Sequence, residues 1–333
     1  MSTPIQRVVL VARPNGPATL ENFRIEQASL AAPAEGEVSV ALRYLSADPY
    51  MLRLISGEID YKPGVAPGDA MFGRAVGEVV ESRDAAFVPG DPVFLWTYWQ
   101  NQVVARASEL RKLDLGVAPW PAWLGVLGHS ALTAWAGLID VGRPRAGETV
   151  LVSAASGAVG SVVGQLAKIS GCRAVGIAGG PDKCRHVVDF LGFDACVDYK
   201  APDLEAQLAA ALPDRVDVYF ENVGGAMMDT VLPHMNRHGR IVVCGMISDY
   251  LSDEPIRMKH LERIMSQALR VEGFAVSEYF ARQEAVNRDL ARWYRAGQLK
   301  YHETISEGLE SAPAALVGLQ SGRNLGKQLV RVS

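Results

Sequence analysis

The chain has 333 residues, of which 49% are hydrophobic and 21% charged, a length and composition typical of a globular enzyme with two domains. A formal net charge of −4 provides no global positive field that would attract nucleic acid. The amino-terminal residues lack the apolar core of a signal peptide, and no apolar run is long enough to span a membrane. We therefore expect a cytoplasmic protein with no membrane or nucleic-acid partner.

The cysteines argue against a disulfide framework and against a structural metal site. The four of them, at positions 172, 184, 196 and 244, are too few and too scattered for such a framework. They also lack the CxxC spacing of structural zinc sites. A reducing compartment and the absence of a bound metal are the resulting expectations.

The first 122 residues are predicted to be rich in β-strands. Residues 37–44 largely alternate, with Val38, Val40, Leu42 and Tyr44 on one face. Further strands are expected at residues 71–81, 92–95 and 102–104. Proline and glycine lie between these runs, which is typical of a compact barrel-like domain with long loops.

The character of the sequence changes at Trp123. Residues 124–139 are apolar with helical spacing, and strands and helices then alternate. The predicted strands are 150–152, 173–177, 195–197, 216–220, 240–243 and 270–274; the predicted helices are 158–169, 182–191, 203–212, 226–235 and 278–296. This alternation predicts a parallel sheet with helices on both faces, and six strands suit a Rossmann sheet.

A dinucleotide-binding fingerprint lies at the first strand of this half. The apolar run 150–152 is followed by small residues, and from Ala158 the apolar residues recur at helical spacing. Ala155, Gly157 and Gly160 occupy the three fingerprint positions, with Ala155 replacing the first glycine. A pyrophosphate would sit at the helix N-terminus, where unpaired N–H groups favour an anion. The alternative is a Gly-rich turn that binds nothing.

The residues after the second strand favour NADP over NAD. NAD sites place an acidic residue about 20 positions after the glycines, where this chain has Ala178, Gly179 and Gly180. Lys183 and Lys200 follow, and cations suit a 2′-phosphate. Asp182 is the one residue against this interpretation, and Lys183 could alternatively be a solvated helix residue.

The tail beyond Ile305 is predicted to contain a short helix at 312–319 and a strand at 326–332. The strand could add to the large sheet or return to the first domain, and the pattern alone does not decide between them.

Six motifs carry a resemblance to a known family over nearly the full length. They are residues 44–51, 154–161, 198–200, 221–225, 244–250 and 322–327. In order and spacing the chain resembles the zinc-independent medium-chain dehydrogenases/reductases, in particular the leukotriene B4 dehydrogenase/prostaglandin reductases, plant alkenal double-bond reductases and bacterial curcumin reductase.

The resemblance implies a fold, a cofactor and a site. The fold would be a GroES-like β-barrel (residues 1–122 and 305–333) and a doubly wound Rossmann domain (residues 123–304), with the active site in the cleft between them. The expected cofactor is NADPH, with Lys183 and Tyr199 at its 2′-phosphate and Asn324 near its nicotinamide. The full implied set of cofactor-binding residues is Ala155, Ser156, Gly157, Ala158, Val159, Gly160, Gly179, Lys183, Tyr199, Asn222, Cys244, Gly245, Ile247, Tyr250, Phe274, Val276 and Asn324.

The implied chemistry is reduction of a C=C bond conjugated to a carbonyl. No cysteine precedes Cys172, so the barrel lacks the thiolate ligand of zinc alcohol dehydrogenases. Hydride would instead add to the β-carbon of an enal or enone, and the enolate oxygen would need a donor. Tyr50 and Tyr250 are the candidates for stabilising or protonating the enolate, although both could merely pack at the site while the ribose hydroxyl and water serve. A quinone reductase and a cofactor-binding sensor without turnover are the alternatives.

Two further expectations concern a departure from the family and the assembly. His129 stands where relatives often carry a Met-Pro-Gly, and it either hydrogen-bonds locally at a helix start or touches substrate or cofactor. Because Rossmann sheets of this superfamily commonly pair their edge strands, we expect a homodimer joined near residues 270–274.

Overall fold

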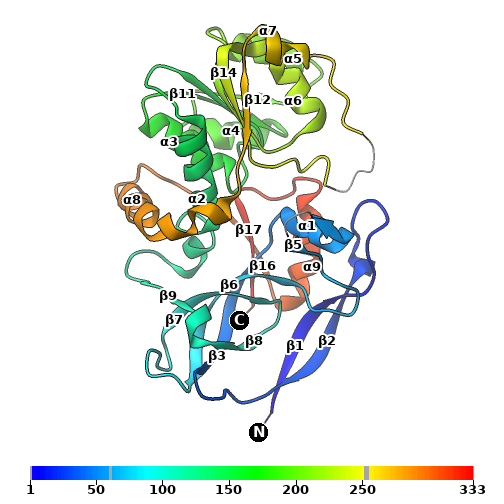
Figure 1. Ribbon diagram of the computed structural model, residues 1–333, viewed down its shortest axis with the longest axis vertical. Coiled ribbons are helices and arrows are strands. Elements are labelled where there is room, and N and C mark those ends of the chain that lie inside the picture. Colours follow the sequence, from blue (N-terminus) through cyan, green and yellow to red (C-terminus); the bar gives the residue numbers. More distant parts are fainter. Residues whose placement is uncertain (1, 60–61, 251–254, 333) are drawn as a thin grey trace. The chain divides into compact units, whose positions relative to one another are not determined.

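The computed structural model describes residues 2–59, 62–250 and 255–332, which form two compact units (Figure 1). The first unit comprises Met1–Leu124, Glu303–Asn324 and Gln328–Ser333, and the second comprises Gly125–His302 and Leu325–Lys327. Within the described ranges, no helix combines the length and apolarity needed to cross a membrane.

The first unit is built around strand β3 (Glu37–Ser46). Its antiparallel neighbours are β6 (Phe72–Ser82), β8 (Gln102–Arg106) and β17 (Lys327–Arg331). The sheet continues through β7 (Pro92–Tyr98) to β9 (Arg111–Lys112), and through β17 to β16 (Glu303–Glu307). The predicted strands at 37–44, 71–81, 92–95 and 102–104 are therefore confirmed; the second is shifted by one residue, and the other three are somewhat longer than expected. Short helices join them: α1 (Tyr50–Ser56), α9 (Ala312–Leu319) and several 3₁₀ turns.

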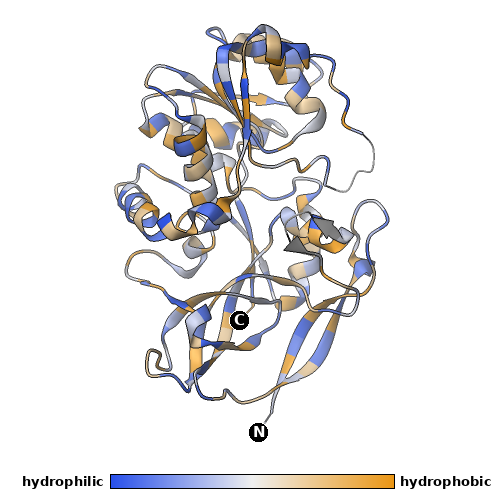
Figure 2. Cartoon of the chain, viewed as in Figure 1, coloured by the Kyte–Doolittle hydropathy of each residue, from blue (hydrophilic) through white to orange (hydrophobic). Residues whose placement is uncertain are grey.

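A two-stranded ribbon, β1 (Thr3–Leu10) and β2 (Phe23–Leu30), precedes this sheet and was not predicted. Hydrophobic and hydrophilic bands alternate along it (Figure 2). Val8 of β1 donates its N–H to Trp99 O and accepts at its carbonyl from Met71 N–H, which ties the ribbon to the rest of the unit. The small strands β4 (Glu58–Ile59) and β5 (Lys62–Pro63) form a separate hairpin.

The tail returns to the first unit. Leu329 and Val330 of β17 face Ser46 and Leu45 of β3 in antiparallel register, and both tail side chains are fully buried. The strand therefore pairs with the sheet of the first unit and does not join the six-stranded sheet.

The second unit contains a six-stranded parallel sheet in the order β12-β11-β10-β13-β14-β15. The strands are β10 (Thr149–Val152), β11 (Arg173–Ala178), β12 (Ala195–Asp198), β13 (Val216–Glu221), β14 (Met235–Val243) and β15 (Arg270–Gly273). This is the 3-2-1-4-5-6 order of the doubly wound dinucleotide-binding fold, which confirms the predicted Rossmann domain.

Side chains alternate between the two faces of this sheet along each strand, and helices cover both faces. One face carries Leu151, Ile177 and Tyr219, which cluster with residues of α5 (Leu204–Ala211) and α6 (Gly225–Val231). The other face packs against α3 (Gly160–Ile169) and the π-helical segment Ala136–Gly142 that continues α2 (His129–Trp135). Helices on the two faces are visible in Figure 1.

The predicted helices exist but deviate locally from α-helical geometry. The segment 124–139 becomes helical only at His129 and ends as a π-helix, where Gly137 allows close packing: a Cβ there would lie 2.6 Å from the Phe220 ring. Helix 182–191 divides into α4 (Pro181–Arg185) and a π-helical turn, and 226–235 ends in a 3₁₀ turn at Pro233. The predicted helix 278–296 is a 3₁₀ segment (Val276–Arg282) followed by α8 (Gln283–Arg295), and α7 (Glu262–Ser266) was not predicted.

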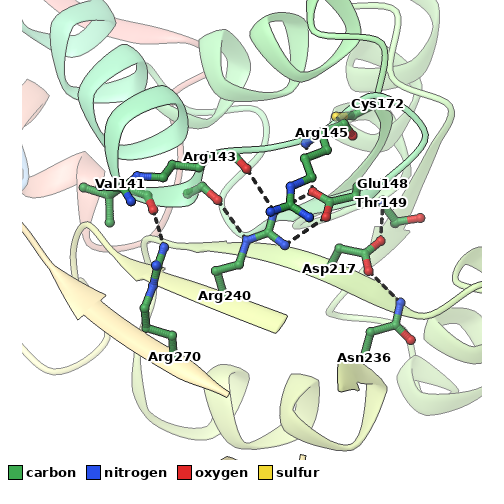
Figure 3. A network of polar contacts seen from close by, with 11 residues as sticks. Val141, Arg143, Arg145, Glu148, Thr149, Cys172, Asp217, Asn236, Arg240 and Arg270 are labelled. Atoms are coloured by element: carbon green, nitrogen blue, oxygen red, sulfur yellow. Dashed lines mark hydrogen bonds and ion pairs between the residues drawn. The ribbon is translucent and has the colours of Figure 1, made fainter. Parts of the chain in front are cut away.

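A polar network joins the strands of the second unit near their amino-terminal ends (Figure 3). Arg240 of β14 binds both carboxylate oxygens of Glu148, at 2.9 and 2.5 Å, and donates to the carbonyls of Gly142 and Arg143. Asp217 accepts from Thr149 N–H. These contacts hold the loop before β10 against the neighbouring strands.

Candidate dinucleotide site

The fingerprint turn is shaped by small residues between β10 and α3. A Cβ on Gly160 would lie 2.4 Å from the Ala154 carbonyl oxygen, so only glycine fits where the helix begins. Ala154 itself has a positive φ of 49°. The helix starts at Gly160 with Val159 as its N-cap, directly after the turn formed by Ser156 to Ala158. Its first N–H groups donate back to this segment, from Ser161 to Gly157 O and from Val162 and Val163 to Val159 O. A turn of small residues that leads into a helix N-terminus is the kind of element that can bind a pyrophosphate.

Ala155, at the first fingerprint position, is accommodated by Gly176 of β11. The position of a Gly176 Cβ lies 2.8 Å from the Ala155 methyl group. Ala155 N–H also donates to Ile177 O at 3.0 Å. A glycine on the neighbouring strand thus makes room for the alanine on this one.

A tail residue contacts the same turn. Gly326 N–H donates to Ser156 O at 2.8 Å, and Gly326 forms a parallel bridge with Gly157. Gly326 is part of the second unit, whereas Asn324, two residues earlier, is part of the first. No sequence pattern predicted this bridge.

The residues directly after β11, Gly179 and Gly180, are not acidic, and two lysines, Lys183 of α4 and Lys200 after β12, follow in the sequence. Burial lowers the pKa of Lys183 and the charge of Lys200 lowers it further, so the two ammonium groups lie close enough to interact. The Tyr199 ring packs on Gly179, 2.8 Å from the position of a Cβ there, and Lys200 Nζ lies 5.9 Å from the centre of that ring. Tyr199 therefore lies against Gly179 and near Lys200, and Lys183 lies within the electrostatic reach of Lys200.

The two acidic residues near these side chains have other partners. Asp198 accepts from Gly180 N–H at 2.7 Å and Lys200 N–H at 3.0 Å, which pins the loop after β11 to the end of β12. Asp182, the residue against NADP, forms an ion pair with Arg185 on the exposed side of α4.

A buried network behind the turn fixes Asn222. Glu221 is fully buried and accepts from Ser153 Oγ at 2.7 Å, Tyr219 O–H at 2.6 Å and Val223 N–H at 2.5 Å. Asn222 donates its backbone N–H to Ser153 Oγ and its Nδ2 to Ser153 O. Burial raises the pKa of Glu221 against the opposing effect of these hydrogen bonds.

No function was predicted for Ser153 or Glu221. The sequence signal that could have identified Glu221 is an acidic residue at the end of an apolar strand.

The loop after β14 folds onto the same network. Cys244 and Gly245 donate their N–H groups to Glu221 O, and Ile247 N–H donates to Asn222 O. Burial, with the charge of Glu221, raises the pKa of Cys244 to about 12, so its thiol stays protonated. Tyr250 O–H accepts from Met246 N–H at 3.3 Å and lies 3.0 Å from the position of a Gly245 Cβ. The predicted residues 222, 244, 245, 247 and 250 are thus brought together.

The remaining predicted residues are placed separately. Phe274 packs on Gly137 and edge-on to Tyr279, and Val276 starts the 3₁₀ segment that follows. His129 begins α2, its carbonyl accepting from Thr133 Oγ1 and its ring 5.9 Å from that of Phe280.

Tyr50 lies in the first unit, at the start of α1. The guanidinium of Arg74 is 5.7 Å from its ring centre and forms an ion pair with Asp48 at 2.8 Å, with both charged side chains buried. Two nitrogens of Arg74, Nε and Nη1, are buried without a hydrogen-bond partner.

Among residues 2–59, 62–250 and 255–332, no group of three or more His, Cys, Asp or Glu side chains is placed to hold a metal ion.

Comparisons with known proteins find relatives over nearly the whole chain. Residues 6–113 match the family described as "N-terminal domain of oxidoreductase", and residues 158–293 match "Zinc-binding dehydrogenase". The chain is 43% identical to the "NADPH-dependent curcumin reductase" of Escherichia coli strain K12, covering 98% of this chain and 97% of that one. It is 43% identical to the "2-alkenal reductase (NADP(+)-dependent)" of Nicotiana tabacum, with 90% and 89% covered.

The chain belongs to this reductase family of the medium-chain dehydrogenases/reductases. Rat prostaglandin reductase 1 is another member, 42% identical over 94% of both chains. The solved structure of CurA from Vibrio vulnificus in complex with NADPH has a TM-score of 0.92 and 39% identity, with 98% of this chain and 99% of that one covered. Membership confirms the resemblance drawn from the six motifs, whereas zinc independence stays a prediction.

Proposed function

We propose that the protein is an NADPH-dependent reductase of the C=C bond of α,β-unsaturated aldehydes and ketones, and that it works without a metal. The observation that carries the proposal is full-length similarity to curcumin and alkenal reductases whose names specify NADPH or NADP. The site fits this cofactor: Gly160 admits a phosphate-binding turn that any Cβ would block, and Lys183 and Lys200 flank the place of a 2′-phosphate.

Each part of the site has a task in this reaction. Bound NADPH supplies a hydride to the β-carbon of the substrate. The fingerprint turn holds the pyrophosphate, and Asn222, held by Ser153, orients the cofactor beyond it. The substrate becomes an enolate whose oxygen is stabilised by a hydroxyl donor, for which we propose Tyr50 and Tyr250. A proton then reaches the α-carbon from a tyrosine, which is protonated at neutral pH, or from water.

Deuteride on the transferable position of the cofactor tests the bond that is reduced. The label is expected on the β-carbon of a saturated product, with the carbonyl intact, and turnover is expected to survive exhaustive chelation. An allylic alcohol labelled at the former carbonyl carbon would exclude double-bond reduction. Turnover of quinones but of no enal or enone would favour the quinone reductase alternative, and NADPH binding without any turnover would favour a sensor.

Phenylalanine substitutions test the two tyrosines. Tyr250→Phe or Tyr50→Phe is expected to lower kcat by up to roughly 10²–10³-fold if that hydroxyl donates to the enolate oxygen, because one oxyanion donor is lost. Unchanged kcat in both single variants and in the double variant would assign the proton route to the ribose hydroxyl and water, and would leave the double-bond chemistry intact.

A further inference from the structure

Two cysteines of the second unit meet across neighbouring elements. Cys184 lies in α4 and Cys196 in β12, and their Sγ atoms are 2.9 Å apart. A disulfide bond is about 2.05 Å long, so the sulfur atoms lie less than about 1 Å beyond bonding distance. Both are free thiols, and neither is fully buried.

The surroundings leave room for this pair. Cys196 is in register with Gly176 of β11, and a Cβ on Gly176 would lie 3.4 Å from Cys196 Sγ. The other two cysteines are placed elsewhere: Cys172 Sγ donates to Arg145 O at 3.2 Å, and Cys244 lies beside the Glu221 network.

The pair is built into the elements that carry the predicted 2′-phosphate site. Lys183 directly precedes Cys184 in α4, a helix of only five residues. Tyr199 and Lys200 follow Cys196 by three and four positions, and α4 packs against β12. A change in the distance between the two sulfur atoms therefore moves the residues that would contact the phosphate.

We propose that Cys184 and Cys196 are a modification site: a low-molecular-weight disulfide oxidises them to a reversible intramolecular disulfide, and this bond weakens the binding of NADPH. The effect on the cofactor rests on the proposed function, whereas the disulfide itself does not.

The chemistry is a pair of thiol–disulfide exchanges. Cys196 Sγ–H donates to Cys184 Sγ, and this hydrogen bond lowers the pKa of Cys184, which makes it the attacking thiolate. Attack on the reagent forms a mixed disulfide on Cys184 and releases one thiol, which takes the proton of Cys184. Cys196 then loses its proton, displaces the second half of the reagent and closes the bond. Two protein thiols are oxidised, and one reagent disulfide is reduced to two thiols.

Closing the bond disturbs phosphate recognition through geometry. Charge-assisted hydrogen bonds to phosphate are short, about 2.7–2.9 Å, so a displacement of α4 approaching 1 Å carries Lys183 out of that range. Loss of one such bond corresponds to at least about a tenfold loss of affinity.

Oxidised glutathione tests the disulfide on the full-length protein. After treatment, intact mass is expected to fall by two hydrogen masses and peptide mapping to join Cys184 to Cys196, with both changes reversed by dithiothreitol. Cys184→Ser and Cys196→Ser are expected to lose this product, while Cys172→Ala, the matched control, keeps it. A stable glutathione adduct, or a link through Cys172 or Cys244, would overturn the assignment, and the untreated natural chain serves as the reference if a variant fails to fold.

NADPH binding, followed by cofactor fluorescence without substrate, tests the coupling. The oxidised protein is expected to bind NADPH at least about tenfold more weakly than the reduced protein, and oxidant is expected to have no effect on Cys184→Ser. Equal affinity of the oxidised and reduced forms would overturn the coupling and leave the disulfide standing. Absence of NADPH binding to the reduced protein would instead contradict the proposed function.

Discussion

At the scale of single residues, cofactor choice depends on a few side chains at the end of β11. Burial lowers the pKa of Lys183, and the nearby charge of Lys200 lowers it further, so the two cations repel each other. The free energy of binding a 2′-phosphate is therefore expected to include relief of this repulsion, which NADH, having no phosphate there, cannot supply.

Lys183→Ala is expected to raise the Kd of NADPH by about 10–100-fold and to change that of NADH little, because one charge-assisted contact to the phosphate is lost. Parallel fluorescence titrations with the two cofactors measure the difference. The control is Lys168→Ala. Lys168 lies in α3, its Nζ is 2.7 Å from Asp194 Oδ1, and it has no assigned role at the site. Equal weakening of both cofactors by Lys183→Ala, or equal affinity of the natural chain for both, would contradict NADP preference.

At the scale of elements, the ion pair between Glu148 and Arg240 joins the loop before β10 to β14. Burial opposes ionisation of Glu148, but the hydrogen bonds from Arg240 and from Arg145 N–H outweigh it and lower the pKa of the carboxyl group. A carboxyl group with a lowered pKa in the folded state stabilises the fold at pH values above its unfolded pKa, which is near 4.5. That stabilisation is lost as the pH falls through the folded value.

Glu148→Gln is expected to reduce the free energy of unfolding by about 1–3 kcal/mol at pH 7, because Arg240 keeps its charge and loses its ionised partner. The deficit is expected to shrink below pH 4.5 as the natural carboxyl group becomes protonated. Urea midpoints at pH 7 and pH 4 measure both effects. Glu284→Gln is the control, since the Glu284 side chain is 92% exposed and its pair with Arg288 contributes little. A deficit that does not change with pH would show that the charge is not responsible.

The elements also show which structural features a sequence can predict. The six strands of the parallel sheet were predicted because most contain a short apolar run and helical patterns separate most of them, as at β10 and β13. β1 and β2 were missed because charged residues such as Arg7 and Glu26, which pair across the ribbon, interrupt the apolar pattern. The π-helical turn after Trp135 depends on how Gly137 packs against Phe220, which no local pattern encodes.

The same limit applies within the candidate site. Glycines and cations that a phosphate requires are recognisable one residue at a time, as Gly160 and Lys183 were. The support of Asn222 by Ser153 and Glu221 joins positions almost 70 residues apart. It could not be derived from spacing, because burial of a carboxyl group is a property of the assembled sheet.

At the scale of the whole molecule, β15 is an edge strand of the parallel sheet and all four of its residues are exposed. An uncovered edge presents unpaired N–H and C=O groups to any other strand. We therefore propose that two copies of the chain pair at this edge through a twofold axis.

Light scattering at micromolar concentration is expected to give the mass of a dimer. Val271→Lys is expected to shift the protein towards monomer, because like charges would then meet near the axis. Val80→Lys, which changes a similarly exposed valine of β6 in the first unit, serves as the control and is expected to remain dimeric. A monomeric mass for the natural chain would rule out this interface, and a Val271→Lys protein that stays dimeric would place the interface elsewhere.

The return of β17 to β3 has a consequence for biosynthesis. The second unit can fold on the ribosome as soon as residues 125–302 have emerged, apart from the short segment Leu325–Lys327. The first unit must wait for the final strand, although β3 and β6 were translated more than 200 residues earlier. During that interval the half of β3 around Leu45 has an open edge, because β17 is its pairing partner there. Nascent chains that stall before β17 are thus the species most exposed to aggregation and to capture by chaperones.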